Sequence, residues 1–157
     1  MKPGRAPPRF DRRDDRGQVA GLEALPFGVL IFVVGTLLVA NAWAVVDAKL
    51  AVVAAAREGA RTYVEAPDLE TARLGAHQAA QEAVSGHGRS PERLDLEIDD
   101  RAGFARCTPI EVTARYPVPA LTLPWIGGFG EGFTVRATHA ELVDPFRNGL
   151  EGAARCG

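Results

Sequence analysis

A run of 23 residues without a charged side chain, Ala24–Val46, most constrains what this chain can fold into. As an α-helix with a rise of about 1.5 Å per residue it would be roughly 35 Å long, which exceeds a hydrocarbon core of about 30 Å. A buried core helix is the alternative. Such helices are usually amphipathic, whereas this segment is apolar on every face. The sequence therefore predicts one membrane-spanning helix.

Charge is unevenly distributed around this segment. Residues 1–16 carry six of the 18 basic side chains and three of the 20 acidic ones. The positive-inside rule then predicts a cytoplasmic N-terminus and an extracytoplasmic body, with Trp43 at the outer membrane–water interface. We expect no nucleic-acid partner, because a nucleic-acid-binding protein would gather its positive charge on the folded face.

A cleaved secretory signal peptide is a second interpretation of the same region. Its cleavage site would be Ala42-Trp43-Ala44, which has the Ala-x-Ala pattern. However, the apolar run is longer than the usual ~7–15 residues of a signal peptide. The helical pattern also continues past the site without a helix breaker. We therefore expect one long helix from about Leu22 to about Glu65, the first half in lipid and the second half protruding.

The protruding half repeats at spacings of three and four residues. This periodicity predicts an apolar stripe, interrupted by Arg57 and Arg61, that consists of Leu50, Val53, Ala54, Ala60 and Val64. Glu58 and Glu65 stand three or four residues from one or other arginine and can form helix-surface ion pairs. Two interpretations stay open: a solvated face, or an edge that packs against neighbouring copies.

Pro67 marks a helix boundary, and a second helix is predicted over residues 68–84 with Asp68 as its N-cap. Gly86 and Gly88 would end it. Its narrow apolar stripe of mostly small residues comprises Leu69, Ala72, Ala76, Ala79, Ala80, Ala83 and Val84. Small side chains predict close packing against another helix, most simply the protruding half of the first.

Three segments alternate between apolar and polar residues and predict strands, at residues 93–99, 107–118 and 132–143. They can form an antiparallel sheet with one buried face, covered by the second helix. The predicted fold class is thus α+β. The predicted domains are a basic cytoplasmic leader (1–17), a transmembrane and protruding helix (18–66) and a small extracytoplasmic α+β domain (67–157).

The chain has two cysteines, Cys107 and Cys156, both in the part expected outside the membrane. An even count and an exported context favour a disulfide, and free or intermolecular thiols are the alternative. Without neighbouring histidines the two cysteines do not make a zinc site.

The sequence offers no catalytic constellation, and we expect neither an enzyme nor a cofactor. Its histidines, His77, His87 and His139, are scattered without metal-ligand spacing. The glycine-rich stretch 127–132 is not followed by a predicted helix, so a turn is favoured over a phosphate loop. A row of carboxylates could offer calcium ligands but is better explained as the solvent face of a strand; it comprises Glu92, Asp95, Glu97, Asp99 and Asp100.

Residues 12–66 resemble the N-terminal region of TadE-like proteins, the minor pseudopilins of tight-adherence (Flp-type, type IVb) pilus systems. The matching elements are an Arg/Asp-rich leader ending in Arg16-Gly17, an early Glu23, the apolar helix and the box AAREGAR at Ala55–Arg61. The C-terminal stretch THAELVDPFR, residues 138–147, is similar to the terminal strand of actinobacterial members. From residue 67 onward the resemblance is loose.

The resemblance implies a single-pass membrane protein that assembles with other pilins or pseudopilins and with assembly platform proteins. It implies cleavage by a prepilin peptidase after Gly17, and subunit contacts through Glu23, Arg57, Glu58 and Arg61. In pilins the glutamate is the fifth residue after the cleavage site, whereas Glu23 is the sixth. Either the cleavage register differs, or the chain stays uncleaved as an anchored assembly factor.

Two further functions remain open from the sequence. One is a single-pass sensor or accessory protein whose ectodomain binds a ligand, for which the loop around Trp125 is the candidate surface. The other is a protein secreted after signal cleavage.

Overall fold

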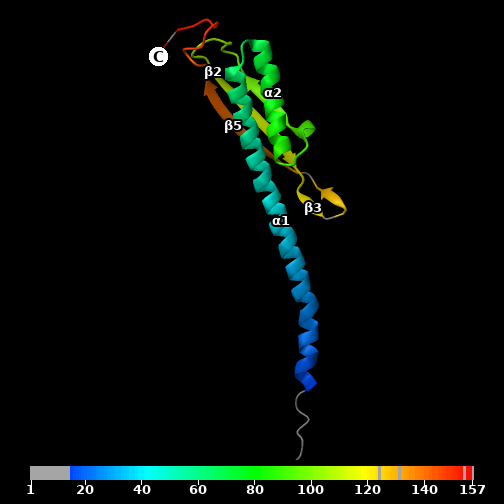
Figure 1. Ribbon diagram of the computed structural model, residues 1–157. Helices are drawn as coiled ribbons and strands as arrows, with labels where there is room; N and C mark the ends of the chain where they lie inside the picture. Colours follow the sequence, from blue (N-terminus) through cyan, green and yellow to red (C-terminus); the bar gives the residue numbers. More distant parts are fainter. Residues whose placement is uncertain (1–14, 124, 131, 154, 157) are drawn as a thin grey trace, which may run out of the picture. The chain divides into compact units, whose positions relative to one another are not determined.

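The computed structural model describes residues 15–123, 125–130, 132–153 and 155–156, without the side chains of residues 15–23, Leu121 and Phe129. It is an α+β structure, as predicted, with one long helix, a second helix and a small antiparallel sheet (Figure 1). The chain has two parts, residues 1–39 and 40–157, which are treated separately below. The long helix contributes to both.

Helix α1 runs from Asp15 to Glu65 and ends where Pro67 predicts. It begins seven residues before the predicted start at Leu22. Over Ala24–Glu65 it is long enough and apolar enough to cross a membrane. Pro26 lies inside it, about three turns after the start at Asp15, so it is an interior proline that removes the hydrogen bond to the carbonyl four residues earlier.

Helix α2 (Leu69–Gly86) begins after the predicted N-cap Asp68, but it ends two residues later than predicted, includes Gly86 and has His87 as its C-cap. Asp68 accepts hydrogen bonds from the backbone N–H of Thr71 (2.9 Å) and from its hydroxyl (2.9 Å), which satisfies one of the free donors of the first turn. Gly88 follows the helix with a φ of +69°, the left-handed conformation that ends helices. The short 3-10 helix η1 (Pro91–Arg93) then leads into the sheet.

The main sheet is antiparallel, with the order β1 (Asp95–Asp99), β2 (Pro109–Val118), β5 (Phe133–Leu142). The predicted alternation is confirmed in the central strand, whose buried face carries Ile110, Val112, Ala114, Tyr116 and Val118. In β5 Val135 and Ala137 are buried as expected, but Phe133 at its start is 60% exposed. The register places Ala114 opposite Ala137, so small side chains meet where a helix crosses the sheet.

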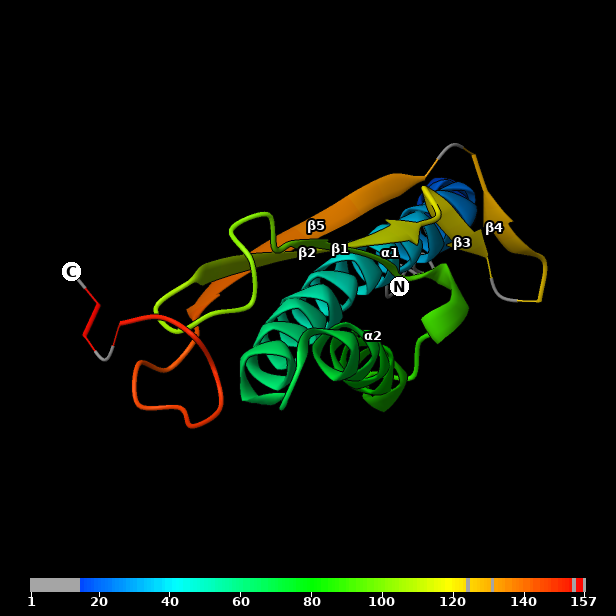
Figure 2. The same cartoon turned by 90° about the horizontal axis from the view of Figure 1, so that it is seen from above.

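The buried face of the sheet is covered by both helices. The prediction gave this role to the second helix, but α1 shares it from Ala48 onward. Figure 2 shows both helices on the same side of the sheet. Gly59 lies where the three layers meet: a Cβ placed there would be 3.3 Å from the carbonyl oxygen of Ala76 and 3.5 Å from Val112 Cγ1. Glycine therefore lets α1 approach α2 more closely than a larger residue would without a shift of the neighbouring backbone.

The predicted apolar stripe of α1 is wrong. Leu50 and Val53 are exposed, and of the five predicted members only Ala60 is fully buried. The face that packs on α2 and the sheet instead consists of Ala48, Ala51, Val52, Ala55, Ala56, Gly59, Ala60 and Tyr63. Because most of these side chains are small, α1 can pack closely against α2 and the sheet.

The Pro/Gly-rich connection between β2 and β5 also differs from the expected simple turn. It forms a second, two-stranded sheet from β3 (Leu121–Leu123) and β4 (Gly127–Phe129). Trp125 and Ile126 lie at the tip of this β3–β4 hairpin. Gly127 has a φ of +104°, a conformation that glycine adopts without strain, so the glycine content here serves a tight turn.

Candidate functional site

Two of the predicted site residues, the cleavage position and the early glutamate, lie near the start of α1. Gly17 and Glu23 belong to the first turns of α1. The surroundings of both residues lie outside the described part of the chain. Cleavage after Gly17 and a subunit contact of Glu23 therefore stay predictions.

From the end of the predicted membrane segment onward, α1 keeps an apolar face turned away from its own domain. Trp43, Val46, Leu50 and Val53 are 72%, 49%, 56% and 45% exposed. We call these four residues the seam. They follow one another at spacings of three, four and three, the repeat by which two helices pair along a narrow line. A contiguous exposed apolar surface of this kind marks a contact with lipid or with another protein.

The three charged residues of the predicted subunit contact extend this surface. Arg57 is four residues after Val53 and is exposed, and among the described residues it makes no hydrogen bond or ion pair. Arg61 is also exposed and pairs with Glu65, Nε to Oε1, at 3.1 Å, and this hydrogen bond raises the pKa of Arg61. Glu58 is half-buried, and its negative charge also raises the pKa of Arg61, to a smaller extent than Glu65 does. An exposed pair of this kind contributes little stability.

Arg89, just after α2, links the loop that follows this helix to the C-terminal end of the uncharged segment of α1. Its guanidinium donates to the carboxylate of Asp47 through Nη2 at 2.8 Å and to the carbonyl of Ala44 at 2.8 Å. The same group lies 5.6 Å from the ring centre of Tyr116, and that of Arg93 lies 5.4 Å from it. Asp47 is therefore paired, and the first charged position after the apolar run is held by the folded domain.

Asp100 joins three elements at the other end of the domain, and sequence reasoning missed this role. Its Oδ2 accepts from the hydroxyl of Tyr63 at 3.0 Å and from Arg73 Nε at 2.7 Å. The hydrogen bond from Arg73 lowers the pKa of Asp100, and burial raises the pKa of Tyr63. Tyr63 is fully buried and also meets Phe104 edge to face. Nothing in the local pattern of β1 distinguishes Asp100 from its acidic neighbours, so only the assembled structure reveals it.

The predicted disulfide is present between Cys107 and Cys156, with Cα atoms 5.2 Å apart. It holds the C-terminal segment beside the sheet. In that segment the guanidinium of Arg147 donates to the carbonyls of Val64 and Glu65, which satisfies two free acceptors at the end of α1. The carbonyl of Arg147 accepts in turn from Arg106 Nε at 2.7 Å.

The acidic row on β1 pairs with arginines. Arg115 on β2 contacts both Asp95 (3.2 Å) and Glu97 (2.7 Å), and Arg101 pairs with Asp99. Hydrogen bonds from Arg101 lower the pKa of Asp99 to about 2. Across the described ranges, no group of three or more acidic, histidine or cysteine side chains is arranged to hold a metal ion. Asp95, Glu97 and Asp99 thus form the charged outer face of β1, whereas Asp100 follows the strand and Glu92 lies in η1.

Trp125, the candidate of the ligand-binding interpretation, is 102% exposed at the tip of the β3–β4 hairpin. It projects outward and lines none of the surface recesses described for this chain. Its backbone φ of +66° is in the left-handed region, which is uncommon for a bulky side chain.

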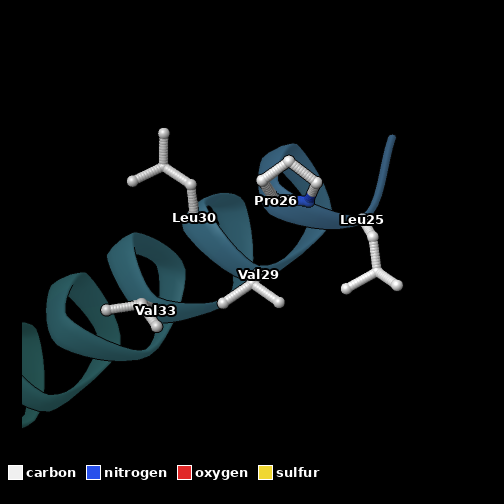
Figure 3. Close-up of a pocket in the computed structure, with 5 residues that line it drawn as sticks. All are labelled: Leu25, Pro26, Val29, Leu30 and Val33. Atoms are coloured by element: carbon white, nitrogen blue, oxygen red, sulfur yellow. The ribbon is translucent and has the colours of Figure 1, made fainter. Parts of the chain in front are cut away.

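An apolar recess lies on the surface of α1 around Pro26. It is lined by Leu25, Pro26, Val29, Leu30 and Val33, whose side chains project outward from the helix (Figure 3). All of these lining residues, within the described part of the chain, are apolar. A purely apolar recess in a segment long enough to span a membrane fits an acyl chain or another helix better than a polar substrate.

Comparison with protein-family models, with curated proteins and with solved structures finds no match to this chain.

Proposed function

We propose that this chain is a membrane-anchored, pseudopilin-like component of a tight-adherence (Flp-type, type IVb) pilus assembly system. In this proposal α1 crosses the membrane once, the N-terminus is cytoplasmic and the α+β domain is extracytoplasmic. The chain acts through helix–helix and ectodomain contacts with other pilus subunits rather than through catalysis.

The observation that carries the proposal is the seam. Its members continue past the uncharged segment, where Leu50 and Val53 would face water in an isolated chain. Their own domain does not cover them, because its core uses the opposite face of α1. The spacing of three and four residues suits a second helix from a neighbouring subunit.

The charges beyond the seam support the same contact. Arg57 is exposed and, among the described residues, unpaired, one turn after Val53. A neighbouring helix laid along the seam would bring its own side chains to this arginine. A carboxylate there would gain a charge-assisted hydrogen bond in a partly desolvated setting. Arg57, Glu58 and Arg61 thus act at the edge of the proposed subunit contact.

Placing carboxylates on the seam, by Leu50→Glu with Val53→Glu, is expected to abolish surface pili. Both side chains are exposed, so the stability of the chain should change by only about 0.5 kcal/mol. However, burying two unpaired carboxylates against another helix costs so much free energy that the helices should not associate. The measurement is the amount of pilus sheared from cells that express the variant, with the membrane level of the protein determined by immunoblot.

The matched control is His77→Glu with Gln81→Glu, which puts two carboxylates on the exposed face of α2. This control should assemble pili normally. Equal piliation of both double variants would show that the seam is not a subunit contact.

Processing of the leader gives a second expected result. Intact-mass spectrometry of the protein extracted from membranes should find a chain beginning at Gln18. Gly17→Leu should block this cleavage, whereas Gly21→Leu, four residues later, should not. A chain beginning at Val45 would exclude both the anchor and the pilus role. An uncleaved chain would leave an anchored assembly factor and exclude processing as a pseudopilin.

A further inference from the structure

We infer that the β3–β4 hairpin is a second membrane contact of this chain, with Trp125 and Ile126 at the headgroup level of the bilayer. This inference rests on the membrane-spanning part of the proposed function. The inference goes beyond the proposed function because it gives a lipid-binding role to the connection between β2 and β5.

The hairpin is fixed to α1 through Asn41. The side-chain oxygen of Asn41 accepts from the backbone N–H of Thr122 in β3 at 2.7 Å, and its Nδ2 donates to the carbonyl of Thr122 at 3.4 Å. The amide thus pairs with one residue of β3 as a neighbouring strand would. Asn41 lies seven residues before Ala48, two helical turns earlier on the face that packs against the sheet. Figure 1 shows the hairpin beside α1.

The contact with Thr122 explains why the polar side chain of Asn41 occurs within an otherwise apolar segment. Asn41 is one of few polar side chains in Ala24–Val46. Side chains that hydrogen-bond are costly at membrane depth unless they have a partner, and Thr122 supplies one. The pairing therefore links the position of the hairpin to the position of the helix in the membrane.

The position of Asn41 along the helix sets the depth of the hairpin. A hydrocarbon core that begins near Ala24 extends over about 20 helical residues, which places its outer boundary near Ala44. Asn41 is within one helical turn of that boundary, and Asp47, paired with Arg89, lies beyond it. The hairpin strand attached to Asn41 is therefore close to the outer headgroup region.

The chemistry of the hairpin suits this depth. No charged residue occurs from Tyr116 to Gly130. At the tip, Trp125 is 102% and Ile126 is 69% exposed. Tryptophan favours the membrane interface, where its ring is in the apolar layer and its N–H is hydrated. The turn itself would be less strained with glycine at the left-handed position of Trp125, so the aromatic ring is explained by a contact outside the chain.

The open edge of the hairpin excludes its insertion deeper into the hydrocarbon core. The small sheet has only two strands, so among the described residues the outer edge of β4 lacks a strand partner. Unpaired backbone groups are not tolerated in hydrocarbon, but headgroups and water satisfy them at the interface.

The test uses the fact that the chain contains two tryptophans, Trp43 and Trp125. The full-length Trp43→Phe variant keeps Trp125 as its one tryptophan, and Trp125→Phe keeps Trp43. Each variant is reconstituted into phosphatidylcholine vesicles, either plain or brominated on the acyl chain next to the headgroup. Tryptophan emission is measured with and without aqueous iodide.

We expect Trp125 to lose most of its emission in brominated vesicles and to be protected from iodide, and Trp43 to be quenched by bromine as well. Quenching of Trp43 alone would overturn the hairpin contact while the membrane span stands. If bromine quenched neither tryptophan, the membrane span would be overturned, and with it the membrane part of the proposed function.

Discussion

Replacing Cys107 and Cys156 together with serine is expected to lower the free energy of unfolding of the C-terminal part, residues 40–157, by about 4 kcal/mol. The disulfide closes a loop with a sequence separation of 49, and the cross-link mainly removes conformational freedom from the unfolded chain. The native fold also loses a fixed C-terminal segment, including Arg147 at the end of α1. In a small domain this loss is a large share of the total stability.

The measurement is urea-induced unfolding of the full chain in detergent micelles, followed by brief proteolysis that digests the unfolded fraction. A reducing agent should lower the stability of the unchanged protein to a similar degree and leave the double serine variant unaffected. Equal stability of the oxidised protein and the double variant would show that the disulfide does not stabilise the fold.

Gly59→Leu is expected to destabilise the same part by roughly 3 kcal/mol, the upper range for overpacking a filled core. Even a Cβ at this position would be 3.3 Å from the carbonyl oxygen of Ala76 and 3.6 Å from Ala80 Cβ. A leucine side chain therefore requires α1 to separate from α2 and from β2. Fully buried residues on all three elements, Ala56, Ala80 and Ala114 among them, would lose contacts.

Gly86→Leu is the matched control, since a Cβ at Gly86 would have nothing within 4 Å. It introduces the same side chain at the end of α2 and should leave the unfolding midpoint nearly unchanged. The same urea titration serves both variants. If both variants lost the same stability, the contact at Gly59 would not be the cause, because leucine has a higher helix propensity than glycine at either position.

Gly59 and its neighbours also clarify the box AAREGAR, the sequence feature most specific to the resemblance. Ala55, Ala56 and Gly59 face the core, whereas Arg57 and Arg61 face outward. The box therefore carries small residues that pack closely inside and two arginines that are exposed outside. Sequence reasoning predicted a subunit contact for the arginines, which stays a prediction, and did not assign the small residues to the core.

Several features were predictable because they depend on local sequence. The uncharged run, the N-cap at Asp68 and the alternation in β2 each involve residues close together in the chain, and the structure agrees with all three. The disulfide was predictable because the chain has two cysteines, which allow a single intramolecular pair, and because both lie in the part expected outside the membrane.

The orientation of α1 was decided only by the tertiary structure. The spacing of apolar residues favoured Leu50 and Val53 as part of the buried stripe. The fold instead buries the face with Ala55, Ala56 and Gly59, where α2 and the sheet approach closely, together with Val52 and Tyr63. Likewise, Asn41 with Thr122 and Tyr63 with Asp100 are 81 and 37 residues apart, so no local pattern could pair them. The sequence by itself determined the two helices and the three strands of the main sheet, because each depends on residues close together in the chain. The tertiary structure determined which face of the long helix is buried and which is left exposed, because only there do α2 and the sheet approach it closely.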